Sequence, residues 1–146
     1  MPAAATDTGV RISRVLNAPP ERVFRAWTTP EEMKNWASPP GYTNPFVGAD
    51  LRVGGRYEIH MLAPSGLLRR VAGTYREIDP PRKLVYTWLW EEPAGAPESV
   101  VTVEFRPHAQ GTELILLHDC LPTAESREQH AQGWTGCLVK LLDLYR

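Results

Sequence analysis

Turn-forming residues divide the segment from residue 45 to residue 119 into short pieces, and this spacing restricts the fold more than any other feature of the sequence. Clusters such as Gly54-Gly55, Pro64-Ser65-Gly66 and Asp79-Pro80-Pro81 interrupt the segment at regular intervals. The pieces between the clusters favour strands, at residues 46–52, 56–62, 67–78, 83–91, 99–106 and 112–119. Short connections can join antiparallel neighbours, whereas parallel neighbours need crossovers of about a dozen residues or more. The pattern therefore predicts an antiparallel meander.

The flanking segments predict one more strand and three helices. Apolar residues alternate with polar ones over residues 9–17, which favours a strand. Two short helices are expected at residues 20–27 and from residue 30 onward, because each has proline in its first turn. Residues 123–146 carry an apolar stripe at i, i+3 and i+4, typical of a long amphipathic helix. We expect an α+β fold in which a seven-stranded curved antiparallel sheet grips the C-terminal helix, with the two short helices after strand 1.

Composition excludes several classes of function. The chain has 146 residues and is expected to form a single domain, residues 1–146, with residues 1–8 as a flexible tail. Sixteen basic and seventeen acidic residues nearly cancel, so a nucleic acid or an anionic membrane is not an expected partner. Eighteen apolar residues never occur in a row, which excludes a membrane-spanning helix. Cys120 and Cys137 are typical of reduced thiols, and the first residues lack a secretory pattern, so a cytoplasmic location is expected.

The order of elements, with particular residues in each, resembles the START or birch-allergen-like (SRPBCC, helix-grip) superfamily. More narrowly, the chain is similar to bacterial homologues of the activator of heat-shock protein 90 ATPase. The stretches that carry the resemblance lie in every predicted element, namely Asn17-Ala18-Pro19, Val23-Phe24-Arg25-Ala26-Trp27-Thr28, Pro30-Glu31, Trp36, Pro39, Asp50-Leu51-Arg52-Val53-Gly54-Gly55-Arg56-Tyr57, Gly73-Thr74-Tyr75-Arg76-Glu77-Ile78, Pro80-Pro81, Leu84-Val85-Tyr86-Thr87-Trp88, Val101-Thr102-Val103-Glu104-Phe105, Gly111-Thr112-Glu113-Leu114 and Gly133-Trp134.

The resemblance implies a pocket between the sheet and the C-terminal helix. Members of the superfamily bind lipids, hormones or polyketides there, and some catalyse cyclisation or hydration, so the fold alone does not imply a reaction. The chain departs from many relatives after Trp36, where Ala37-Ser38 replaces a tryptophan and a glycine. Because that loop borders the pocket mouth in the family, a ligand preference does not transfer to this chain.

The alternation of residues along the strands predicts which side chains face this interior. Leu84, Tyr86, Trp88 and Trp90 share one face of their strand, which would place Thr87 outside. Many buried aromatic residues with polar tips are typical of a small-molecule site, although a solid aromatic core is the alternative. The candidate ligand-binding residues are Tyr57, Tyr75, Tyr86, Trp88, His118, His130 and Trp134.

Single residues provide weaker signals for chemistry. His118 lies at the end of the last predicted strand, on the face that also carries Leu114 and Leu116. It could act as an acid or base with Tyr57 or Tyr75, but a single histidine on an interior face is more often a hydrogen-bonded core residue. His60 alternates with Tyr57 and Ile59, which are expected to face inward, so it is expected on the outer face and at the surface. Gly133 lies within the long helix, where it costs about 1 kcal/mol relative to alanine. Close approach of the helix to the sheet or to a ligand would explain this glycine.

A zinc site at His118, Asp119, Cys120, His130 and Cys137 is disfavoured, because His130 and Cys137 are about 10 Å apart along a helix. No residue is therefore assigned as catalytic or metal-ligating, and no cofactor is expected.

These observations leave three classes of function. A domain that binds a small apolar or aromatic molecule is favoured over an enzyme. The enzyme alternative is a polyketide cyclase or hydratase that uses His118 and a tyrosine. A cofactor of a chaperone ATPase is disfavoured, because the eukaryotic activator has an additional N-terminal domain. A homodimer through exposed sheet or loop surfaces is compatible with the sequence.

Overall fold

The fold is described by a computed structural model that covers residues 4–5 and 9–146. Its elements follow one another along the chain as β1 (Ala4–Ala5), β2 (Val10–Leu16), α1 (Pro20–Thr28), α2 (Pro30–Met33), β3 (Val47–Ala49), β4 (Arg56–Leu62), β5 (Leu68–Asp79), β6 (Lys83–Trp90), β7 (Ser99–His108), β8 (Gly111–Asp119) and α3 (Ala124–Asp143). Each predicted strand and helix has a counterpart in this order, with ends shifted by a few residues.

All strands belong to one antiparallel sheet with the order β1-β2-β8-β7-β6-β5-β4-β3. The strands β2 to β8 are the seven predicted strands, and the α+β class is confirmed. Strands β3 to β8 pair with their neighbours in sequence, as expected for a meander. β2 continues the sheet beyond the meander by pairing with β8, where Val10 lies opposite His118 and Leu16 opposite Thr112.

The first eight residues were predicted to form a flexible tail, and the structure places part of this segment in the sheet. The two residues of β1, Ala4–Ala5, pair with Arg11 and Val10 of β2. Residues 1–3 and 6–8 lie outside the described part of the chain.

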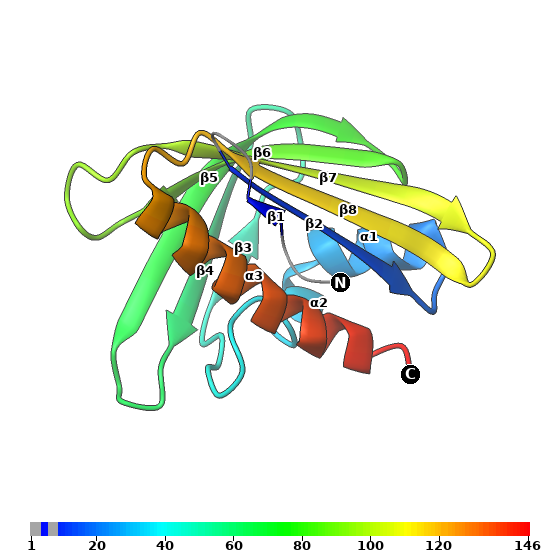
Figure 1. Ribbon diagram of the computed structural model, residues 1–146, viewed down its shortest axis with the longest axis horizontal. Coiled ribbons are helices and arrows are strands. Elements are labelled where there is room, and N and C mark those ends of the chain that lie inside the picture. Colours follow the sequence, from blue (N-terminus) through cyan, green and yellow to red (C-terminus); the bar gives the residue numbers. More distant parts are fainter. Residues whose placement is uncertain (1–3, 6–8) are drawn as a thin grey trace.

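Local sequence signals explain where the helices begin. Pro20 and Pro30 occupy the first turns of α1 and α2, where a missing N–H costs no hydrogen bond. At the start of α3, the hydroxyl oxygen of Thr123 accepts a hydrogen bond from the backbone N–H of Ser126 at 3.0 Å. In Figure 1 the sheet bends around α3, and α1 and α2 lie near the C-terminal half of that helix.

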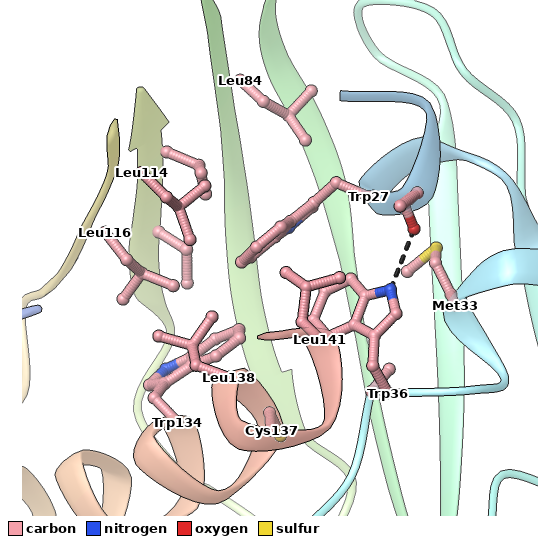
Figure 2. Packing of buried hydrophobic residues seen from close by; sticks show 14 of the residues in the cluster. Trp27, Met33, Trp36, Leu84, Leu114, Leu116, Trp134, Cys137, Leu138 and Leu141 are labelled. Carbon is pink, nitrogen blue, oxygen red and sulfur yellow. Dashed lines mark hydrogen bonds between the residues drawn. The ribbon is translucent and has the colours of Figure 1, made fainter. Parts of the chain in front are cut away.

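The hydrophobic core lies between the concave face of the sheet and α3. Trp134, Leu138 and Leu141 of α3 face Leu114 and Leu116 of β8, as Figure 2 shows. Helix α1 and the turn after α2 add aromatic side chains to this core, since the rings of Trp27 and Trp36 pack with centroids 4.4 Å apart. The indole N–H of Trp36 donates to the carbonyl oxygen of Ala26 at 3.0 Å, the dashed line in Figure 2. A helix as short as α2 therefore owes its stability to this packing.

The ladder between β5 and β6 is interrupted beside Thr87, and the prediction that Thr87 faces outward is wrong. The Thr87 side chain is buried, and its hydroxyl accepts the backbone N–H of Thr74 at 2.8 Å. Its carbonyl turns towards the interior and accepts the Tyr57 hydroxyl at 2.5 Å. A Cβ on Gly73 would come within 2.0 Å of that carbonyl oxygen. The glycine thus allows a backbone carbonyl to point into the core, a departure that strict alternation cannot predict.

A candidate ligand pocket between the sheet and the C-terminal helix

A pocket of about 330 Å³ lies between the sheet and α3. Its walls come from α1, α2 and the loop after α2, from β4, β5 and β6, from the loop between β6 and β7, and from α3. Aromatic and aliphatic side chains provide most of this lining, as is usual for small-molecule sites.

The structure brings six of the seven candidate site residues to this pocket, and these are Tyr57, Tyr75, Tyr86, Trp88, His130 and Trp134. His118 does not line the pocket. Its side chain is fully buried behind Trp88 and Trp134, and its ring centroid lies 5.5 Å from that of Trp88. The expectation that His118 contacts a ligand directly is therefore not supported by its position.

His118 instead holds Trp134 in place. The indole N–H of Trp134 donates to Nδ1 of His118 at 2.9 Å, and an indole nitrogen can only donate. Nδ1 must therefore be unprotonated, and the ring proton of the neutral imidazole is on Nε2, which lies 2.7 Å from the Ser99 hydroxyl. Burial, followed by the nearby His130, lowers the pKa of His118 from 6.5 to about 3. The imidazole is thus a neutral link between β7 and α3.

His130 forms a similar link at the pocket itself. Its Nδ1 donates to the carbonyl oxygen of Ser126 at 2.7 Å, and its Nε2 accepts the indole N–H of Trp90 at 3.0 Å. Burial lowers the pKa of His130, and the charge of Arg69 acts in the same direction. The two imidazole rings pack with centroids 4.7 Å apart. Two neutral histidines thus orient two tryptophans of the pocket wall.

The three tyrosines of the lining are buried, so we call their part of the pocket the closed end, and they retain their protons. Tyr57 donates to Thr87, as described above, while the Tyr86 hydroxyl accepts the indole N–H of Trp27 at 3.1 Å. Burial raises the pKa of Tyr57 and of Tyr86 well above the ordinary value. The pKa of Tyr75 rises to about 12 for the same reason, with Asp50 adding to the effect. Each phenol therefore remains a neutral hydrogen-bonding group at physiological pH.

Five polar residues of the lining are exposed or half-buried, and we call them the mouth: Arg69, Glu92, Ser126, Gln129 and His130. Arg69 is exposed, and its guanidinium lies 4.1 Å from the centroid of the Trp90 ring, within the range of a cation–π interaction. Arg69 has the same parity on β5 as the buried Val71 and Tyr75, so alternation could have placed it on the inner face; sequence reasoning missed it because only apolar and aromatic side chains were counted there. Only the position of Trp90 on the neighbouring strand brings the two together.

The two glycines of α3, Gly133 and Gly136, have different surroundings. A Cβ on Gly133 would meet nothing within 4 Å, so the helix makes no close approach to the sheet at this position, while the approach to a ligand stays a prediction. Gly133 borders the open pocket instead. The close approach occurs one turn later, where a Cβ on Gly136 would come within 2.6 Å of the Pro40 ring. Gly136 therefore allows the loop after α2 to lie against the helix.

Lys140 fastens the same loop to α3. Its ammonium group donates to the Ser38 hydroxyl and to the carbonyl oxygen of Tyr42, both at 3.1 Å. Asn44 completes the arrangement through its carboxamide, which accepts the Ser38 hydroxyl and donates to the carbonyl of Ala37. The loop carries Pro39 and Tyr42 of the pocket lining, so these contacts define one wall.

Sequence reasoning also missed Trp27 and Trp36 as pocket residues. Both belong to the stretches that carry the family resemblance, and both line the pocket. The signal was present in their size, because short helices must bury their aromatic side chains against something. What the sequence does not contain is the angle at which α1 and α2 meet the sheet.

Other kinds of site find little support in the described residues. Within residues 4–5 and 9–146, no three side chains of the types that bind metals come together. His60 lies on the outer face and is partly covered by the ring of Phe46, with centroids 5.0 Å apart. None of the helices in these ranges combines the length and the apolar character needed to cross a bilayer.

A curved antiparallel sheet around a long helix, with a pocket between them, defines the helix-grip class of proteins. Within this class, residues 17–145 match the family model described as "Activator of Hsp90 ATPase homolog 1-like protein". The chain therefore belongs to this family, which confirms the resemblance. No curated protein matches it.

Solved structures agree with this assignment. The chain is similar to protein CV1439 from Chromobacterium violaceum, with 34% identity, a TM-score of 0.86, and coverage of 92% of this chain and 94% of that one. It is also similar to the AHSA1 protein from Silicibacter pomeroyi, with 28% identity, a TM-score of 0.81, and coverage of 91% and 94%. A putative uncharacterized protein from Rhizobium leguminosarum has 28% identity and a TM-score of 0.78, with coverage of 92% and 91%.

Proposed function

We propose that this protein binds a small, predominantly apolar organic molecule in the pocket between the sheet and α3. The observation that carries the proposal is the pocket itself, because an interior of about 330 Å³ falls within the range of roughly 300–1,000 Å³ of small-molecule sites. The family assignment is consistent with this function, since the family belongs to a superfamily of ligand-binding domains.

The polar atoms at the closed end specify one feature of the ligand. Tyr86 accepts a hydrogen bond from Trp27, and its own proton has no acceptor among the described residues. The Tyr75 hydroxyl makes no hydrogen bond to the same residues, and the buried indole N–H of Trp88 has no acceptor there either. These groups can all donate. A ligand with an acceptor oxygen, such as a carbonyl, at its inner end would pair with them.

Binding is favoured over acid–base catalysis by the positions of the titratable groups. His118 lies behind the pocket wall, and both of its ring nitrogens have protein partners. The lowered pKa of His118 and the raised pKa of Tyr75 keep both groups neutral near pH 7, with little tendency to exchange protons. A cyclase or hydratase that used this pair would need to rearrange the wall first.

A fluorescent apolar probe tests the proposal. We expect N-phenylnaphthylamine to bind with an increase in fluorescence, and Gly133→Phe to reduce its affinity at least tenfold, because the new ring fills open space beside the pocket. Val139→Phe is the matched control. It adds a ring to an exposed position of the same helix and is expected to leave binding unchanged.

The outcomes of this titration distinguish binding in the pocket from nonspecific binding at the protein surface. If the wild-type protein does not bind the probe, or if Gly133→Phe binds as well as Val139→Phe, the proposal is wrong. Thermal melting of both variants checks that each is folded.

Two further features belong to the proposal. We propose a cytoplasmic location, which agrees with the free thiols of Cys120 and Cys137. The homodimer stays a prediction, to be tested by the mass of the protein in solution.

A further inference from the structure

The charges at the pocket mouth distinguish between kinds of ligand. Among the described residues that line the pocket, Arg69 is the cationic one and Glu92 the acidic one. Arg69 has no ion pair with any described residue, unlike the next residue of β5, Arg70, whose guanidinium lies 3.2 Å from the Glu91 carboxylate. A charge that a protein places at a pocket without a partner of its own is available to a ligand.

Arg69 is also held in one place by a series of contacts. Ser126 accepts a hydrogen bond from His130, and His130 accepts the indole N–H of Trp90. The Trp90 ring is thereby oriented, and the guanidinium of Arg69 lies over it. This series connects α3 to β6 and to β5, so the cation is positioned by three elements of the fold.

The stacking leaves the hydrogen-bond donors of Arg69 free. A guanidinium group that packs its face on an aromatic ring still presents its N–H groups at its edge, in a geometry that suits a carboxylate or sulfonate. The Glu92 carboxylate is in the loop between β6 and β7, and no ring of residues 4–5 or 9–146 holds it in a comparable way. The mouth therefore presents a fixed cation and a loop-borne anion.

From this arrangement we propose that the ligand is an amphipathic organic anion, with an apolar ring system in the pocket and an acidic group bound by Arg69 at the mouth. The inference rests on the proposed function, because it specifies the ligand of the same pocket. It adds a chemical class, an organic acid, and assigns Arg69 as the residue that selects it. Trp90 and His130 act as positioning residues for that guanidinium.

Two matched probes test the inference. Anilinonaphthalene sulfonate has the ring system of N-phenylnaphthylamine with an added sulfonate, so the pair differs by one negative charge. We expect Arg69→Gln to weaken binding of the sulfonate about tenfold and to leave the neutral probe unchanged. Added salt is expected to weaken only the charged probe.

The neighbouring arginine provides the control for net charge. Arg70→Gln removes the same charge from the next position of β5, where the side chain is paired with Glu91 outside the pocket lining. We expect it to change neither affinity. Glu92→Gln gives a test of opposite sign, since removal of the acid should strengthen binding of the sulfonate about threefold without affecting the neutral probe.

The pattern of results separates the two proposals. If the neutral probe binds in the pocket but Arg69→Gln affects both probes equally, or neither, then the inference about the anion is wrong and the pocket function stands. The inference is also wrong if Arg70→Gln matches Arg69→Gln. If neither probe binds, or if Gly133→Phe blocks neither, both proposals fail together.

Discussion

Substitution of Gly73 by alanine is expected to lower the free energy of unfolding by about 3–4 kcal/mol. The added Cβ would lie 2.0 Å from the carbonyl oxygen of Thr87 and 2.7 Å from its carbonyl carbon. These are backbone atoms, so a change of rotamer cannot relieve the clash. Moving Thr87 would break its hydrogen bonds with Tyr57 and with the backbone of Thr74.

The matched control is the same substitution at Gly133. A Cβ there meets nothing within 4 Å, and the residue is inside a helix, so Gly133→Ala should raise stability by about 1 kcal/mol. Urea denaturation followed by tryptophan fluorescence measures both variants. A Gly73→Ala protein within 0.5 kcal/mol of the wild type would contradict the close approach between β5 and β6.

The contrast between these glycines also shows where sequence reasoning ends. The order of strands and helices could be predicted, because turn residues and apolar periodicity are local and β-meanders connect neighbours. The interior position of Tyr86 and Trp88 followed from alternation alone. Alternation failed at Thr87, because a glycine on the opposite strand removes the steric reason for a regular ladder.

The pocket was less accessible to prediction than the fold. Six of the seven candidate residues line it, because inward-facing aromatic residues of the sheet and the helix must surround whatever space is left. His118 was placed correctly on the inner face, but its depth depends on the packing of Trp88 and Trp134 in front of it. The cation at the mouth depends on a contact between neighbouring strands, Arg69 with Trp90, that no local pattern contains.

Acid is expected to destabilise the protein through His118 more strongly than through any other single histidine. In the unfolded chain the imidazole has a pKa near 6.5, whereas in the folded protein it is about 3. Above pH 6.5 the imidazole is neutral in both the folded and the unfolded state, so His118 causes no loss of stability there. Below pH 6.5 only the unfolded state binds it, and the free energy of unfolding falls by about 1.4 kcal/mol per pH unit, reaching roughly 5 kcal/mol near pH 3.

His118→Gln isolates this contribution from that of the carboxylates. A glutamine side chain can accept the indole N–H of Trp134 and donate to Ser99, but it does not bind a proton in this range. The variant is expected to be less stable than the wild type at pH 7 and to lose stability less steeply between pH 6 and pH 4. His108→Gln, at the exposed end of β7, is the control and should follow the wild-type curve. Urea denaturation at each pH provides the comparison.

Parallel curves for the wild type and His118→Gln would contradict a neutral His118 in the folded state. The titration matters for the pocket as well, because a protonated Nδ1 can no longer accept the indole N–H of Trp134. Burial, followed by the neighbouring His130 that packs against the same imidazole, lowers the pKa of His118 and so opposes its protonation. The wall formed by Trp134 and the fold as a whole therefore depend on the same neutral imidazole, and loss of probe binding in acid should accompany unfolding of the protein.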